Sequence, residues 1–218
     1  MTTLLHLDAS VRGDRSLSRR LSREFVQAWR VSRPETRVIR RDLAVEPPPF
    51  VDQNWIAAAF AAPDARTPEM REMLAASDHL IGELEAADVI VLGTPMFNYG
   101  LPARLKAWVD QVIRVGRTFS FDLARGDYPL EPILSGKMLV LLTSTGEFGF
   151  EPGGVRAHMN HLDTHVGAVR AYLGVSEWFH IGVEYQEFGD ARHTASLDAA
   201  VAAVPRLAAQ LAHGPNDS

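Results

Sequence analysis

The sequence predicts an α/β fold in which a parallel sheet lies between two layers of helices. Apolar runs at 89–92 and 138–142 have the composition of strands buried on both faces, as parallel strands between helices are. These runs alternate along the chain with longer segments whose apolar residues recur at helical spacing. This alternation is typical of a doubly wound sheet, because each crossover helix returns the chain to the same sheet.

The first half of the chain alternates in this way from its start. Leu17, Leu21 and Trp29 recur at helical spacing, and Thr67 and Pro68 form the start signal of a later helix. The connection at 47–50 is expected to be extended, because consecutive prolines cannot enter a helix interior or a central ladder. The predicted elements are a strand at 4–9, a helix from 17 to 29, a strand at 37–43, a helix at 68–84 and a strand at 88–95.

The second half continues the alternation and adds one insertion. The segment 117–122, with Gly126 and Tyr128 soon after it, alternates like a short hairpin. The other predicted elements are a helix at 102–115, a strand at 138–143, a helix at 155–173, a strand at 178–183 and a helix at 195–212. With 218 residues in total, we expect a single domain over 1–213 and a flexible tail at 214–218.

Composition narrows the chemistry and the location. The chain has no cysteine, which excludes disulfides, thiol catalysis and thiolate zinc sites, so electron chemistry would belong to a cofactor. The N-terminal residues lack the basic and apolar regions of a signal peptide, and no apolar stretch approaches the roughly 18 residues of a membrane span. We therefore expect a cytoplasmic protein that does not engage a membrane.

Arginine is concentrated near the N-terminus. Ten of the twenty arginines fall between Arg12 and Arg41, although the net charge of the chain is −5. Acidic residues are interleaved with them, and no aromatic stacking set accompanies them. We interpret the segment as a solvated helix face near an anionic cofactor rather than as a nucleic-acid site.

Three loops follow predicted strands, at 10–18, 94–100 and 143–154, and ligands of such sheets bind beyond the carboxyl ends of the strands. The first loop carries Ser10, Ser16 and Ser18 before a helix. Hydroxyls and free amides at a helix N-terminus suit a phosphate, although Ser16 could equally be a plain N-cap. The loop matches neither the P-loop pattern nor the dinucleotide fingerprint.

The other two loops suit a planar ring. Phe97 and Tyr99 flank Asn98, which favours a flat heterocycle over a plain turn, the alternative being aromatic packing onto the core. The third loop, 143–150, is rich in small, hydroxylated and glycine residues. Such a loop can turn amides towards a carbonyl edge, or it can be an ordinary strand-to-helix connection.

Together these motifs resemble the family of FMN-dependent NADH azoreductases and quinone reductases over nearly the whole chain. The matching residues are Ser10, Ser16-x-Ser18, Pro95-Met-Phe-Asn-Tyr99, Leu101-Pro-x-x-Leu-Lys106-x-Trp-x-Asp110 and Gly116-x-Thr-Phe119. The resemblance implies a flavodoxin-like five-stranded sheet, bound FMN, NADH or NADPH as electron donor, and a quinone or azo compound as acceptor in a ping-pong reaction. It also implies a homodimer with ligand sites at the subunit contact.

The resemblance also implies which residues contact the cofactor. The phosphate contacts would be Ser10, Ser16, Leu17 and Ser18; the isoalloxazine contacts would be Met96, Phe97, Asn98 and Tyr99; further contacts would come from Ser144, Thr145, Gly146 and Glu147. Phe119 and Phe121 of the hairpin could wall the substrate pocket or pack within the hairpin. We expect no catalytic nucleophile or dedicated acid, since protons can come from water.

The sequence departs from the family pattern in two loops. The family commonly has Met-Tyr-Asn-Phe where this chain has Phe97 and Tyr99 in exchanged places. It commonly has Ser-Arg-Gly-Gly where this chain has residues 144–147, so the arginine is missing and Glu147 is added. A carboxylate facing the flavin would disfavour the anionic reduced cofactor and lower its potential, unless Glu147 turns to solvent.

Three other interpretations compete with this one. A non-enzymatic flavodoxin-type electron carrier is the alternative function, and a phosphate-loop hydrolase is discounted because the first loop has no cysteine or histidine to act as nucleophile or base. His158, His161 and His165 would share a face of the predicted helix at 155–173. We favour no metal there, because that face offers no thiolate or suitably spaced carboxylate.

Overall fold

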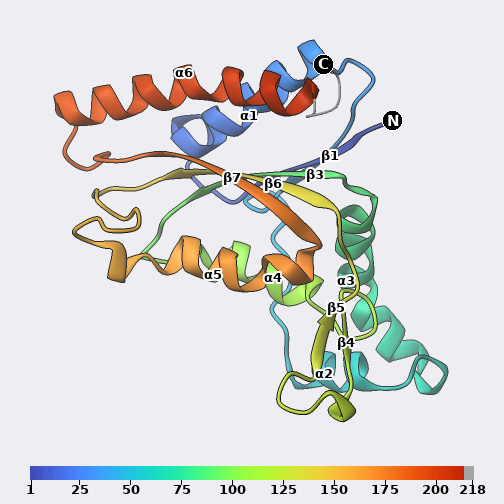
Figure 1. Cartoon of the computed structure of the whole chain (residues 1–218). Helices are drawn as coiled ribbons and strands as arrows, with labels where there is room; N and C mark the ends of the chain where they lie inside the picture. The colour runs from blue at the N-terminus through green and yellow to red at the C-terminus, as the bar shows by residue number, and fades with distance from the viewer. Residues whose placement is uncertain (214–218) are drawn as a thin grey trace.

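The computed structural model describes residues 1–213 and centres on a five-stranded sheet (Figure 1). All neighbouring strands are parallel, in the order β2-β1-β3-β6-β7. The order reverses between β1 and β3, which is the switch point where ligands of this topology bind. The strands are β1 (Thr3–Asp8), β2 (Arg37–Asp42), β3 (Val89–Pro95), β6 (Lys137–Ser144) and β7 (Val175–Val183).

Two layers of helices cover the sheet (Figure 1). One face packs against α1 (Leu17–Ser32) and α6 (Ala191–His213). The other face packs against α3 (Pro68–Ala86), α4 (Ala103–Val112) and α5 (His161–Val169). Short 3₁₀ segments lie at Gly13–Arg15, Pro63–Ala65, Leu123–Arg125, Ala157–Met159 and Arg170–Leu173.

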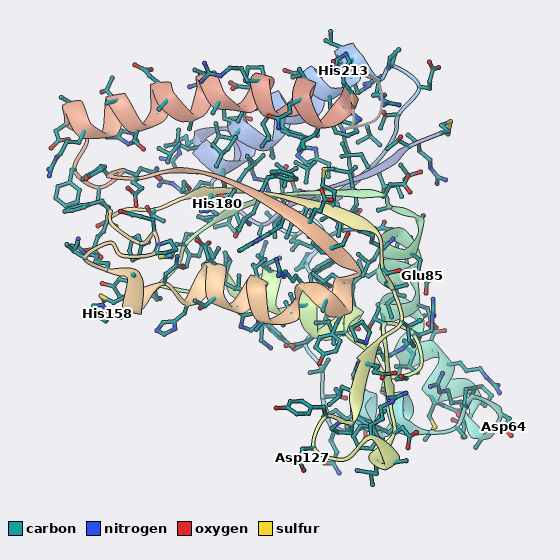
Figure 2. The ribbon with its side chains drawn as sticks, in the orientation of Figure 1. Asp64, Glu85, Asp127, His158, His180 and His213 are labelled. Atoms are coloured by element: carbon teal, nitrogen blue, oxygen red, sulfur yellow. The ribbon has the colours of Figure 1, made fainter. Side chains whose placement is uncertain are left out.

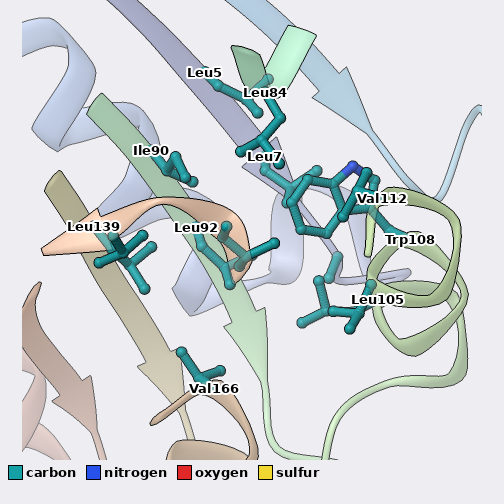
Figure 3. Packing of buried hydrophobic residues seen from close by; sticks show 14 of the residues in the cluster. Leu5, Leu7, Leu84, Ile90, Leu92, Leu105, Trp108, Val112, Leu139 and Val166 are labelled. Carbon is teal, nitrogen blue, oxygen red and sulfur yellow. The ribbon is translucent and has the colours of Figure 1, made fainter. Parts of the chain in front are cut away.

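The central strands are apolar along their length because both of their faces are buried. Leu5 and Leu7 of β1 face the α3–α5 layer, whereas Leu4 faces the α1–α6 layer, so successive side chains enter opposite cores. Figure 3 shows Leu105 and Trp108 of α4 turned towards the strands in the first core. The continuous apolar runs therefore predict these strands correctly.

The predicted hairpin is confirmed, as β4 (Phe119–Phe121) paired antiparallel with β5 (Leu130–Pro132). In Figure 1 it projects away from the five-stranded sheet. The prediction missed one helix, α2 (Gln53–Phe60), which Asp52 caps by accepting a hydrogen bond from the Trp55 amide at 2.7 Å. This helix packs on a small separate cluster that contains Leu74, so its apolar residues did not form a long periodic run.

The helix predicted at 155–173 was too long. Its first part is a turn in which the Arg156 amide donates to the Gly149 carbonyl at 2.7 Å, and α5 begins only after Asn160, whose side chain accepts from the Asp163 amide. After α5 the backbone continues as a 3₁₀ segment. This segment is capped at its C-terminus by Gly174, whose φ of 80° is left-handed. The predicted tail at 214–218 lies outside the described residues.

Within residues 1–213, none of the helices combines the length and the apolar character needed to cross a bilayer.

Candidate active site

The loop after β1 forms a hydroxyl-rich end to α1. Ser16 is the N-cap of α1 and accepts a hydrogen bond from the Arg19 amide at 3.3 Å, so the N-cap interpretation is confirmed. Its Oγ also lies 3.1 Å from the Ser18 Oγ, and both serines are buried together with Ser10. Buried hydroxyls in front of free helix amides remain a chemically suitable site for a phosphate.

A partly buried cluster of polar side chains anchors this loop to β1, β2 and α1. Arg19 donates through Nε to the Ser10 carbonyl at 2.7 Å and pairs in bidentate fashion with Asp42. His6 and Asp8, on β1, both contact the Ser22 hydroxyl of α1, at 2.9 and 2.8 Å. Burial lowers the pKa of His6 and raises the pKa of Asp8.

The loop after β3 is a tight turn held in a strained conformation. Phe97 and Gly100 exchange two backbone hydrogen bonds, at 3.1 and 3.0 Å, and the residues between them, Asn98 and Tyr99, have positive φ of 46° and 66°. Two successive positive φ values define a type I′ turn, which asparagine tolerates and tyrosine does not favour. Phe97 and Tyr99 are 37% and 38% exposed, so these rings are not part of the core, as the alternative would require.

The loop after β6 is joined to the loop before α6. The Thr145 amide donates to the Val183 carbonyl at 2.8 Å, the Tyr185 amide donates to the Glu147 carbonyl at 3.1 Å, and the Glu187 amide donates to the Gly146 carbonyl at 3.0 Å. On the other side, the Met96 amide donates to the Ser144 carbonyl at 2.9 Å. Backbone hydrogen bonds therefore hold three loops at one edge of the sheet.

A ring cluster stiffens the segment before α6. Phe148 and Tyr185 stack with centroids 4.4 Å apart and planes at 14°, and Phe188 packs edge-on against both. The Arg192 guanidinium lies 4.9 Å from the Tyr185 centroid. Tyr185 itself has a φ of 62°, so packing outweighs the cost of a left-handed conformation there.

These loops enclose a cavity of about 440 Å³, within the range of small-molecule sites. Seven of the residues predicted from the sequence line it. They are Ser10, Ser16, Leu17, Met96, Phe97, Ser144 and Gly146. The remaining predicted cofactor contacts, Ser18, Asn98, Tyr99, Thr145 and Glu147, belong to the same loops but do not line the cavity.

Sequence reasoning missed four lining residues, Arg12, Pro95, Gln186 and Glu187. Gln186 and Glu187 follow β7, so they belong to a fourth loop at the carboxyl edge of the sheet. The rule that ligands bind beyond the carboxyl ends of parallel strands points to these two residues as well, because their loop follows the last strand of the sheet.

The carboxylate that faces the cavity is Glu187 rather than Glu147. Glu147 pairs with Arg156 at 3.1 Å, and it raises the pKa of Tyr99 through a hydrogen bond with the phenol. Glu187 instead lies against the backbone of Gly146, where a Cβ on that glycine would fall 2.7 Å from the carboxylate oxygen. A residue larger than glycine at 146 would therefore displace the Glu187 side chain.

Phe119 and Phe121 do not line this cavity within one chain. Phe119 packs edge-on against Tyr172, with centroids 5.8 Å apart, and Phe121 is exposed. Figure 2 shows Asp127, in the connection between β4 and β5, at the lower end of the molecule, and none of the residues that line the cavity comes from β4, β5 or this connection. The hairpin and the cavity therefore occupy different parts of one chain.

The three histidines do not share a helix face, contrary to the prediction. His158 lies in the 3₁₀ segment before Asn160, whereas His161 begins α5, because the Asn160 cap separates the two segments. Within the described part of the chain, no group of three or more His, Asp or Glu side chains is placed to hold a metal ion. A different histidine, His180 of β7, contacts the Thr143 hydroxyl at 2.7 Å.

The fold and the cavity define a flavodoxin-like protein that offers a binding site at the carboxyl edge of its sheet. A family model described as a flavodoxin-like fold matches residues 2–207. The FMN-dependent NADH:quinone oxidoreductase 2 of Idiomarina loihiensis is 50% identical over 100% of this chain and 94% of its own length. The FMN-dependent NAD(P)H:quinone oxidoreductase 1 of Pseudomonas aeruginosa is 41% identical over 92% of this chain and 95% of its own length. The chain belongs to the family of FMN-dependent NADH:quinone oxidoreductases.

Solved structures agree on the fold. An azoreductase from Bacillus anthracis superposes with a TM-score of 0.85 at 22% identity, covering 97% of this chain and 100% of its own. An FMN-dependent NADH-azoreductase from the same species, in complex with FMN, superposes with a TM-score of 0.84 at 17% identity, with the same coverage. At these identities the likeness concerns the fold alone.

Proposed function

We propose that this chain binds FMN in the cavity at the carboxyl edge of the sheet and transfers two electrons from NADH or NADPH to a quinone. The carrying observation is that one cavity joins Ser16, at the N-terminus of α1, to Phe97 and Gly146 of the other loops. The first end suits a phosphate monoester, and the second suits a flat ring with a polar edge. Family membership over the full chain supports the same cofactor.

The residues fit the two ends of FMN. Ser10, Ser16 and the amides that begin α1 would hold the phosphate. Met96 and Phe97 would contact the ring, and Gly146 would face its polar edge. When bound, FMN supplies the two-electron chemistry, accepting hydride equivalents from the nicotinamide and passing them to the acceptor.

The protein's own part is orientation and access. The backbone bonds between the loops fix the walls of the cavity, while exposed Phe97 and Tyr99 present apolar faces to planar molecules that enter from solvent. A donor and an acceptor that use one open face in turn would follow a ping-pong scheme. Azo compounds are planar acceptors too, and we include their reductive cleavage, in two successive rounds, in the proposal.

We further propose a homodimer in which the hairpin of one copy covers the cavity of the other. The hairpin exposes apolar side chains, among them Leu123 at 73% and Tyr128 at 85%. Phe121 is exposed on the same hairpin and would then reach a substrate bound to the partner copy, together with Phe119. We also propose that the protein acts in the cytoplasm.

The test begins with the purified protein. Its visible spectrum, and the identity of the flavin released on denaturation, should report FMN, and NADH or NADPH oxidation should accelerate on adding a benzoquinone or an azo dye. A protein that takes up no FMN after incubation would contradict the cofactor assignment. A protein that binds FMN but reacts slowly with both nicotinamides would instead be an electron carrier.

A further inference from the structure

We propose that the groove between α1 and β2 binds a multiply phosphorylated anion of the nucleoside polyphosphate class, at a site separate from the flavin cavity. The groove has a volume of about 700 Å³, which is enough for a nucleotide. It runs along the outer side of α1 and shares only Ser16 with the cavity described above. The proposal does not depend on the proposed function.

One face of α1 forms the first wall. Arg19, Arg23 and Arg30 recur along it at intervals of four and seven residues, so their side chains lie on the same side of the helix. The sheet forms the floor, where Arg40 of β2 lies beside His6 of β1 in the parallel register. Arginine side chains therefore line the groove from both α1 and β2.

Three of these guanidinium groups have no ion-pair or hydrogen-bond partner among residues 1–213. They are those of Arg23, Arg30 and Arg40, and all three residues are exposed. The other lining arginines are engaged: Arg19 with Asp42, Arg20 with Glu24, and Arg41 with Glu46 and Glu83. An arginine fork without a carboxylate partner is free to take two phosphate oxygens at once.

The acidic residues of the groove leave a positive excess. Six arginines and three aspartates line it, in a chain whose net charge is −5. Asp42 is neutralised by Arg19, and Asp8 is turned towards the Ser22 hydroxyl, where burial raises its pKa. Only Asp14, which lies in the loop after β1, is an exposed carboxylate of the groove without a partner within the described residues.

The uncharged residues that line the groove indicate which class of phosphorylated ligand would bind there. Val26, Val31 and Pro34 give one end of the groove an apolar surface that a base or ribose can contact. Among residues 1–213, no Phe, Tyr or Trp lines the groove, which disfavours single-stranded nucleic acid, because such sites stack successive bases on aromatic rings. This lining fits a ligand whose phosphates lie against the arginines and whose nucleoside lies against the apolar end.

The test is calorimetric titration of the FMN-saturated protein with ATP and with inorganic triphosphate at low salt. The test variant is Arg30→Gln with Arg40→Gln, and the matched control is Arg71→Gln with Arg206→Gln, two exposed arginines outside the groove. We expect ATP to bind the wild type and the control alike, and the groove variant about 100-fold more weakly, at roughly tenfold for each lost guanidinium contact. Triphosphate should bind more weakly than ATP, because it lacks the nucleoside.

Steady-state kinetics with NADH separate this site from the donor site. The groove variant should keep the wild-type KM for NADH, since neither arginine lines the flavin cavity. Absence of saturable ATP binding at millimolar concentration, or equal affinities in the groove and control variants, would overturn the proposal. A raised KM for NADH would show that the groove is part of the donor site, and tighter binding of a single-stranded oligonucleotide than of ATP would assign it to nucleic acid.

Discussion

At the scale of single residues, the acidic group that matters most for the flavin cavity is Glu187. Its side chain lines the cavity and lies against Gly146, whereas Glu147 has turned away to Arg156 and Tyr99. An unpaired carboxylate close to a cofactor disfavours the state of that cofactor with more negative charge. The expected effect on the flavin therefore belongs to Glu187, and the Arg156 partner largely offsets the charge of Glu147.

Replacing Glu187 with Gln should raise the midpoint potential of bound FMN. Removing one nearby negative charge stabilises the reduced cofactor by about 1 kcal/mol, which is roughly 20 mV for a two-electron couple. Equilibration of the bound flavin with a reference dye during slow reduction measures this shift. The matched control is Glu147→Gln, which should move the potential less; a larger shift in that control would mean that Glu147 is the group that acts on the flavin.

Buried His6 makes stability depend on pH. Burial lowers its folded-state pKa below the ordinary value of 6.5, so the unfolded chain binds a proton that the native state resists. The stability that depends on His6 being neutral is therefore fully present above pH 6.5, and it is lost as the pH falls from 6.5 towards the lowered pKa. Asp8 acts in the opposite sense at lower pH: its pKa is raised from 3.8, so its protonation favours the folded state.

We expect the free energy of unfolding to fall between pH 7 and pH 5.5, by at most about 1.4 kcal/mol per pH unit for each such histidine. His165, whose pKa burial also lowers, contributes in the same direction. Urea unfolding at several pH values measures the decline, which should be shallower in His6→Gln and unchanged in the exposed control His213→Gln. A slope that His6→Gln leaves unaltered would contradict the assignment.

At the scale of elements, the N-terminus of α1 combines a structural and a binding role in one residue. Ser16 caps the helix through its Oγ and also lines the flavin cavity. The two roles respond differently to charge, because a carboxylate caps a helix as well as a hydroxyl does but repels a phosphate. Substitutions at this position can therefore separate them.

Ser16→Asp should fold with near wild-type stability and lose most of its affinity for FMN. Ser16→Ala, which cannot cap α1, should lose about 1 kcal/mol of stability and bind FMN more weakly than the wild type. Urea unfolding without cofactor and quenching of FMN fluorescence on binding measure the two effects. If Ser16→Asp bound FMN as tightly as the wild type, the phosphate would not lie at this end of the cavity.

Elements buried on both faces are the ones that the sequence predicts best. β3 and β6 are continuous apolar runs because each contacts two helix layers, and α1 and α3 each keep one buried, mainly apolar face over about three turns. The orientation of Glu147 could not be predicted, because its partner Arg156 is brought to it by the turn at Gly149. That turn depends on the path of the whole loop, which has no periodic pattern.

For the molecule as a whole, the strand order determines which loops lie together and line the binding cavity. The order β2-β1-β3-β6-β7 brings the loops after β1, β3, β6 and β7 to one edge, although they are far apart in sequence. The same order leaves β2 at the edge of the sheet, next to α1, where the arginine-lined groove opens. The hairpin is the exception, since it is an insertion that lies outside the five-stranded sheet and contacts the body of the chain through Phe119, which packs against Tyr172.

The proposed homodimer gives that hairpin a role which can be tested on two levels. Leu123 and Tyr128 are apolar or aromatic side chains left largely in solvent, and exposed patches of this kind mark protein contacts. Leu123→Ser with Tyr128→Ser should shift the protein from dimer to monomer in sedimentation at micromolar concentration. The double variant should leave folding intact, because neither residue is buried. Val31→Ser, an equally exposed apolar position on α1, should leave the dimer unchanged.

If the hairpin also covers the partner's cavity, the monomeric variant should keep FMN, since the lining of the cavity lies within one chain, and lose quinone turnover through a raised KM. A variant that becomes monomeric with an unaltered KM would restrict the hairpin to assembly, and a variant that stays dimeric would place the subunit contact elsewhere.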